Sequence, residues 1–257
     1  MTLEFEVRDR VARITLNRPE ALNAIDPETI RALSEAWAEV RDNNDIWVAL
    51  VRGGGDRAFS AGMDVKKTIT RSAAPANFYN SQRLQTLERG LEVNKPVVAA
   101  IHGYCLGGGL TLALACDIRI ASDDAVFGLP EIKRAIFPSE GATWRLPRQV
   151  PWAVAMEMLI LGENIDAQRA YDVGLVNKVV PRDELEDAAE DVVERLLALP
   201  PLTMRATKES ALRCLDLPLD EALRFESLMS RTLRTTQDFK EGPASFTEKR
   251  TPVYRGE

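Results

Sequence analysis

Two glycine-containing loops carry the residue types that could perform chemistry on a carbonyl group. They are RAFSAGMD (57–64) and GYCLGGGL (103–110), and the second runs directly into an apolar stretch, LTLALAC. Glycine lets a ligand approach the backbone closely, and the first amides of a helix have no acceptor within that helix. One amide from each loop would form an oxyanion hole, which stabilises the charge of an enolate or a tetrahedral adduct. A tight strand-to-helix turn needs glycine too, so on the residues alone a purely structural role is an equal alternative.

Alternating strands and helices must position these loops. Alternation of apolar and polar residues predicts a strand pair at 3–9 and 11–18, and a helix follows at 26–43 with Asp26 as N-cap and Pro27 in its first turn. Continuous apolar runs predict buried strands. After Pro147 the patterns are mostly helical, with one short strand at 175–181. The other elements that we expect before Pro147 are strands at 46–53, 95–103 and 117–122 and a helix at 80–94.

Composition narrows the classes of function. The chain has 257 residues, 45% hydrophobic residues and a net charge of -6, with no basic stripe, so nucleic acid is not an expected partner. No apolar run reaches the length of a membrane span and no signal-peptide core is visible, so we expect a cytoplasmic protein. Its three cysteines lack metal-site spacing, so free thiols and no metal are expected. The single histidine, His102, is interpreted as a packing residue.

Several segments carry a resemblance to a known family. NRPEALNAI, AFSAGMD, AAIHGYCLGGGLTLALACDIRIAS, FGLPEIK, LPRQVPWAVAMEMLILGENIDAQRAYDVGLVNKVVP and SFTEKRTPVYRGE, in this order, resemble the enoyl-CoA hydratase/isomerase (crotonase) superfamily over nearly the whole chain. The resemblance implies an α/β fold, with a crotonase-like spiral of β-β-α repeats at 1–195. It also implies a helical C-terminal oligomerisation region at 196–257 and a homotrimer or dimer of trimers. The substrate would be an acyl-CoA thioester, so coenzyme A is part of the substrate and no separate cofactor is expected.

The resemblance also assigns residues to the site. It places the oxyanion hole at the backbone amides of Met63 and Gly108, and the acyl pocket along 66–83. A phenylalanine and a lysine of the last helix, Phe246 and Lys249, would reach the CoA of a neighbouring subunit. For the lysines near residue 66 a solvated surface charge is an equal alternative. The other residues that match CoA-binding positions are Arg18, Ala21, Leu22, Ala61, Asp64, Val65 and Lys66, of which Arg18 could instead cap a strand.

One of the two glutamates that family hydratases use is missing. Glu131 of the GLPE segment matches one, but the other position holds Thr111. A threonine hydroxyl can hold a water molecule, yet its pKa is far too high for it to act as a base. One carboxylate over an oxyanion hole is enough to move a proton between two carbons, as in double-bond isomerisation. Glu140 is a candidate second acid or base, or else a first-turn residue of the next helix with Ser139 as N-cap.

We therefore predict an enzyme of enoyl-CoA hydratase/isomerase type, a lyase or an isomerase. It would act through an enolate held in the oxyanion hole, with Glu131 as the proton-transfer residue. Two alternatives stay open. One is another reaction of the same family, such as decarboxylation or ring chemistry. The other is an acyl-CoA binding protein without turnover, which the threonine at position 111 makes worth considering.

Overall fold

The larger of two β-sheets has six strands, in the order β1-β2-β3-β5-β7-β10. The computed structural model describes residues 1–68 and 84–257. β1 pairs with β2 in antiparallel fashion, and every other pair in this sheet is parallel. The predicted strand pair and buried strands are thereby confirmed. The strand bounds are Leu3–Arg8, Val11–Leu16, Val48–Gly53, Val97–Ile101, Ile118–Ser122 and Lys178–Val180.

A second sheet of four short strands was not predicted from the sequence. Its order is β4-β6-β8-β9, with β4, β6 and β8 parallel and β9 antiparallel to β8. Each of β4, β6 and β8 follows one long strand of the first sheet, and helical turns follow each of them, so the chain repeats a strand-strand-helix unit. This repeat confirms the spiral that the resemblance implies. The strands span Ala58–Ser60, Tyr104–Leu106, Val126–Gly128 and Ile165–Asp166.

Helices cover both faces of the six-stranded sheet. Side chains alternate between the faces of a strand, so Ala49 and Val51 of β3 join the core that also contains α1 (Pro27–Asp42), while Val48 and Leu50 face α8. The Asp26 side chain accepts a hydrogen bond from the Thr29 amide at 2.9 Å, as its predicted N-cap role requires. Helix α8 spans Leu185–Leu197.

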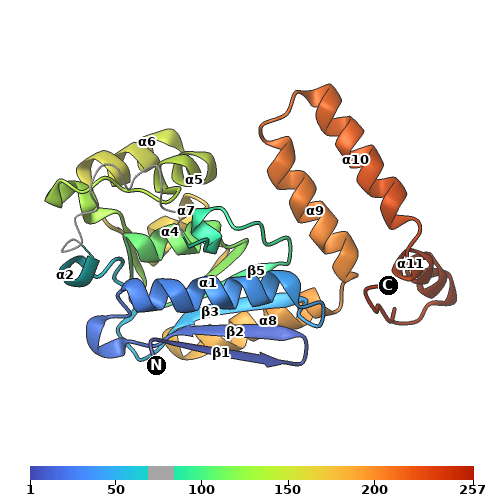
Figure 1. Cartoon of the computed structure of the whole chain (residues 1–257), viewed down its shortest axis with the longest axis horizontal. Helices are drawn as coiled ribbons and strands as arrows, with labels where there is room; N and C mark the ends of the chain where they lie inside the picture. Colours follow the sequence, from blue (N-terminus) through green and yellow to red (C-terminus); the bar gives the residue numbers. More distant parts are fainter. Residues whose placement is uncertain (69–83) are drawn as a thin grey trace.

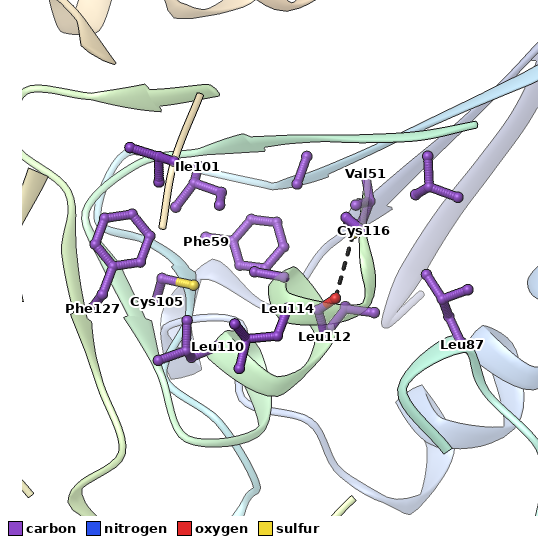
Figure 2. Close-up of a cluster of buried hydrophobic side chains, with 14 of the residues drawn as sticks. Val51, Phe59, Leu87, Ile101, Cys105, Leu110, Leu112, Leu114, Cys116 and Phe127 are labelled. Atoms are coloured by element: carbon purple, nitrogen blue, oxygen red, sulfur yellow. Dashed lines mark hydrogen bonds between the residues drawn. The ribbon is translucent and has the colours of Figure 1, made fainter. Parts of the chain in front are cut away.

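Helix α4 (Gly108–Ala115) lies at the centre of the core. Figure 2 shows Leu110, Leu112 and Leu114 of this helix among Phe59, Ile101 and Phe127, all of them at most 1% exposed. Apart from Thr111 the helix is apolar all round, because nearly all of its side chains are buried. Cys116 donates to the Leu112 carbonyl at 3.4 Å, and burial raises the pKa of its thiol to about 12. Burial likewise lowers the pKa of His102 to about 4, as suits a packing residue.

The predicted helix at 80–94 is wrong over its described part. Residues 84–94 contain only a single 3-10 turn, Leu87–Arg89, which ends at Gly90 in a left-handed conformation with φ of +94°. Leu87, Leu91 and Val93 are all buried in the core. Their spacing imitates an amphipathic helix, although the segment runs irregularly across the core beside α4.

Three helices follow α8 and form a separate arm of the chain. Figure 1 shows α9 and α10 as an antiparallel pair beside the α/β body, with α11 near the C-terminus. They span Pro201–Cys214, Leu219–Leu233 and Gln237–Glu248. Large apolar side chains of this arm, such as Leu219 at 75% exposure, face outward. Such exposure suits the predicted oligomerisation region, which stays a prediction, as does the boundary at residue 195.

The remaining helices pack around α4 and the small sheet. Helix α5 spans Ala142–Gln149, and α6 (Trp152–Met156) continues into a π-helical turn at Glu157–Leu161. Helix α7 covers Ala167–Asp172, and α2 is a single turn at Val65–Thr68. No helix in the described part of the chain is long and apolar enough to cross a membrane.

Arg119 fastens the C-terminal end of α4, and its removal should destabilise the fold. It is buried and donates to the carbonyls of Leu175 (2.6 Å), Ala113 (3.1 Å) and Cys116 (2.6 Å). We expect Arg119→Met to lower the free energy of unfolding by about 2–4 kcal/mol, because buried acceptors lose a charged donor. Urea unfolding followed by circular dichroism measures this. Arg195→Met, which removes a 76%-exposed side chain on α8, is the control and should change stability by less than about 0.5 kcal/mol. Equal unfolding midpoints for the two variants would contradict the expectation.

Candidate active site

Three loops meet at one edge of the small sheet. Strands β4, β6 and β8 are parallel, so their carboxyl ends lie at the same edge. The chain leaving β4 carries Gly62 and Met63, and the chain leaving β6 carries Gly107 and Gly108. The chain leaving β8 enters a 3-10 helix, Pro130–Arg134, which contains Glu131. The parallel register thus brings together three segments that are far apart in the sequence.

The first two loops touch each other through glycine. Gly62 has a φ of +91°, and a Cβ there would lie 2.8 Å from the Leu106 carbonyl oxygen and 3.0 Å from the Gly108 nitrogen. A Cβ on Gly108 would lie 3.5 Å from the Met63 nitrogen. The Met63 and Gly108 amides therefore lie close together, and neither has an acceptor among the described residues. Two such donors suit one oxygen atom that gains negative charge.

Hydrogen bonds on either side hold the Met63 peptide in place. The Ile25 amide donates to the Gly62 carbonyl at 2.8 Å, and the Asp64 amide donates to the Ile25 carbonyl at 2.9 Å. These two hydrogen bonds lie on either side of Met63. The fully buried Ser60 hydroxyl donates to the Asn23 carbonyl at 2.8 Å and accepts from the Gly62 amide at 3.2 Å. The first loop is thereby held by the Ser60 side chain and by the backbone of residues 23–25.

Glu131 faces the second glycine loop. Its Oε1 lies 3.0 Å from where a Cβ of Gly107 would be, so a larger residue at this position would crowd the carboxyl group. Its Oε2 is buried and has no hydrogen-bond partner among the described residues. Burial raises the pKa of the Glu131 carboxyl above its ordinary value of 4.5. A carboxyl group with a raised pKa and an unused oxygen is suited to accepting and returning a proton.

Thr111 lies in the first turn of α4 and lines the same space. Its side chain is only 2% exposed, and its hydroxyl donates to the Gly107 carbonyl at 3.1 Å. Because the hydroxyl hydrogen is bonded to the helix backbone, the oxygen can still accept a hydrogen bond from a water molecule.

A cavity of about 530 Å³ contains these groups. It holds all five residues predicted to be catalytic and five of those predicted to bind CoA. Arg18 and Leu22 do not line it. No sequence motif predicted Leu106, Arg134, Ile136 or Phe137, which also line the cavity. The predicted residues that line the cavity are Met63, Gly108, Thr111, Glu131 and Glu140, with Ala21, Ala61, Asp64, Val65 and Lys66.

Arg18 forms bonds within its own chain. It donates to the Ala24 carbonyl at 2.6 Å and pairs with the carboxylates of Asp64 (3.2 Å) and Asp26 (3.3 Å). Asp26 also pairs with Lys67 at 2.7 Å. Arg18 therefore links Asp26, the N-cap residue of α1, to Asp64 of the first glycine loop. Its contact with CoA stays a prediction.

Phe246 and Lys249 lie at the end of α11, across the molecule from α2 (Figure 1). Phe246 is 86% exposed and neither residue lines the cavity of its own chain. Their contact with the CoA of a neighbouring subunit stays a prediction. The predicted acyl-pocket segment falls mostly on residues 69–83, outside the described residues.

Glu140 precedes α5, contrary to the prediction that it could lie in the first turn of that helix. It is not in the first turn of α5, which begins at Ala142, and the N-cap is Gly141 rather than Ser139. The predicted cap fails because Glu140 and Gly141 both take left-handed conformations, with φ of +61° and +91°. The Glu140 carboxylate lines the cavity and pairs with Arg89 at 2.5 Å. No sequence motif predicts that Arg89 is the partner of Glu140.

Comparisons with known proteins agree with the geometry. A family model described as enoyl-CoA hydratase/isomerase matches residues 6–257. The chain is 43% identical to the (E)-benzylidenesuccinyl-CoA hydratase of Thauera aromatica over 100% of both chains. It is 38% identical to a carnitinyl-CoA dehydratase of Salmonella enteritidis, over 96% of this chain and 95% of that one. A crystal structure of an enoyl-CoA hydratase from Bacillus anthracis superposes with a TM-score of 0.92, at 33% identity and 100% coverage of both chains.

Glu131 should cost stability in the ligand-free protein. Burial raises the pKa of Glu131 in the folded state above its ordinary value of 4.5. Between these two pKa values the unfolded chain releases the proton more readily, so the stability of the fold falls as pH rises. At pH 7 we expect Glu131→Gln to raise the melting temperature by about 2–4 °C, on the order of 1 kcal/mol. Near pH 4 the gain should disappear, because the wild-type carboxyl is then neutral in both states. Thermal scans at both pH values measure this, with the exposed Glu163→Gln as control. A variant that melts below the wild type at pH 7 would refute the prediction.

Proposed function

The chain belongs to the enoyl-CoA hydratase/isomerase family, enzymes that act on CoA thioesters, and we propose that it adds water reversibly to a 2-enoyl-CoA. The observation that carries this proposal is the buried Glu131 Oε2 close to the Met63 and Gly108 amides, since neither this oxygen nor either amide has a partner among the described residues. A nucleophile, an acid-base group and an oxyanion hole are what a conjugate addition needs, and water supplies the first.

The oxyanion hole would bind the thioester oxygen. When water adds to C3, the electrons of the C2–C3 double bond move toward the thioester carbonyl and its oxygen gains negative charge. The Met63 and Gly108 amides would stabilise the resulting enolate. The apolar helix behind them keeps water away, which strengthens their hydrogen bonds to that charge. The loss of one such donor raises a barrier by roughly 3 kcal/mol.

Glu131 would carry the proton. As a carboxylate it removes a proton from the attacking water, whose hydroxyl forms a bond to C3. The protonated Glu131 then delivers that proton to C2, which discharges the enolate and restores the carboxylate. The sum of the two steps is one water molecule added across the double bond. The Thr111 oxygen and the Glu140 carboxylate line the same cavity and could hold the water by hydrogen bonds.

Isomerisation is the second candidate, because a single carboxylate could move a proton from C2 to C4 without any water. Two features favour hydration. The curated relatives are named as a hydratase and a dehydratase. The cavity also holds water-binding groups besides Glu131, namely Thr111 and Glu140. The same relatives favour turnover over simple binding of an acyl-CoA.

Glu131→Gln should abolish hydration. We expect kcat/KM for a short 2-enoyl-CoA to fall by about 10²–10⁴, because glutamine cannot accept the proton. The loss of the conjugated thioester absorbance measures the rate. Glu163→Gln, which alters an exposed glutamate outside the cavity, should leave the rate unchanged. If the wild type converts a 3-enoyl-CoA but leaves the 2-enoyl-CoA untouched, the enzyme is an isomerase and the proposal is wrong.

The pH dependence of the rate should report the raised pKa of Glu131. Hydration needs the carboxylate form in the free enzyme, so kcat/KM should decline as pH falls through this pKa. We expect the midpoint of the acid limb to lie above 4.5, the ordinary value, because burial favours the neutral form. Steady-state rates between pH 4 and 8, with circular dichroism to verify folding, test this. A flat profile down to pH 4.5 would exclude Glu131 as the base.

A further inference from the structure

A second cavity, of about 980 Å³, lies beyond Glu140. Two chain segments form its walls, one around residues 84–90 and the other around residues 140–145. Glu140 is the one residue that lines both this cavity and the one with Glu131, as far as the described residues show. The Glu140 side chain therefore stands between the reacting end of the site and a second space of sufficient size for part of a ligand.

Of the two arginines that line the second cavity, Arg89 forms an ion pair and Arg145 forms none with the described residues. Arg89 pairs with Glu140, while its Nε is buried without a partner among the described residues. Arg145 uses Nη1 to donate to the carbonyls of Glu88 (2.9 Å) and Glu140 (3.1 Å). Its other nitrogens form no hydrogen bond with the described residues, so one edge of this guanidinium is available to a ligand.

Glu88 forms no ion pair with Arg145. Its Oε1 accepts from the Thr86 hydroxyl at 2.5 Å, and its Oε2 is buried with no partner among the residues described. Burial raises the pKa of this carboxyl, which favours its neutral form. The lining of the cavity thus carries two guanidinium groups, the Glu140 carboxylate that pairs with Arg89, and the Glu88 carboxyl, which forms no ion pair with the described residues.

The backbone is strained where it places Arg145. Glu140 and Gly141 are consecutive left-handed residues, and the first of them is not glycine. A Cβ on Gly141 would lie 2.0 Å from the Arg145 Nη1, so the guanidinium lies directly across a bare Cα. Strain of this kind persists where the surrounding structure requires it, often at ligand sites. Here it holds a cation at the cavity wall.

Trp144 argues against a cationic ligand. Its ring lines the second cavity, but the guanidinium of Arg148 already stacks on it at 4.2 Å from the centroid. A ligand cation would meet an aromatic side chain that already holds a positive charge. The charges on and around this wall therefore favour an anion.

We infer that the acyl chain extends past Glu140 into the second cavity, and that the substrates are CoA thioesters whose acyl group ends in a carboxylate that Arg145 binds. The inference rests on the proposed function, because that function places the thioester beside Glu131. A guanidinium edge pairs with a carboxylate through two parallel hydrogen bonds, which makes the contact selective for a planar anion.

Matched substrates test the inference. The reactive pair is 2-hexenedioyl-CoA and its terminal methyl ester, and the unreactive pair is adipoyl-CoA and its methyl ester. We expect the wild type to favour the free carboxylate about tenfold or more, in kcat/KM for the first pair and in Kd for the second. Arg145→Gln should reduce both preferences to within about twofold by weakening only the carboxylate compounds. Arg195→Gln, at an exposed position on α8 outside this cavity, should keep the preference, and Arg145→Lys should keep part of it.

The outcomes separate this inference from the proposed function. Equal binding of the two saturated thioesters by the wild type, or an undiminished preference in a folded Arg145→Gln, overturns the inference. If 2-hexenoyl-CoA is hydrated and no carboxylate preference appears, hydration stands and the inference fails. If the saturated carboxylate thioester is preferred but no 2-enoyl-CoA is hydrated, the assignment of the reaction fails while Arg145 keeps its role in recognition.

Discussion

The close contact between the two glycine loops is the constraint on which the rest of the structure depends. The backbones at Gly62 and Gly108 approach so closely that a single Cβ at Gly62 would press on the Gly108 nitrogen at 3.0 Å. Parallel pairing of β4 with β6 brings the loops together, and the buried helix α4 keeps the second loop from moving. The short second sheet is therefore the element that builds the site, although it is the smaller part of the fold.

The two ends of α4 have opposite tasks. At its C-terminal end the buried Arg119 donates to two carbonyls of the last turn, which places a positive charge at the negative end of the helix dipole. At its N-terminal end no side chain of residues 1–68 or 84–257 caps the helix, so the Gly108 amide is left for a ligand. The protein satisfies the end of the helix that has no function in binding and leaves the other end open, which costs some stability and gains a preorganised donor.

The sequence predicted the long strands, α1 and the later helices, because burial on both faces or on one stripe leaves a clear periodic pattern. It could not predict β4, β6 and β8, since three residues are too few to show a period of two. The helix at 80–94 failed because Leu87, Leu91 and Val93 are buried from an irregular segment. Met63, Gly108 and Glu131 came from a family resemblance, whereas Arg89 and Arg145 matter only through long-range packing around Glu140.

Glu131 and Glu140 line the same cavity, and their partners give them different tasks. Glu131 has an oxygen without a partner among the described residues, and burial raises its pKa, so its charge can change during a reaction at little cost. Glu140 is held by Arg89 and by a strained backbone, so its position is fixed. A carboxylate fixed in this way is better suited to a wall than to proton transfer. Glu140 lines both cavities, so in the proposed complex it would set the distance between the reacting carbons and the far end of the substrate.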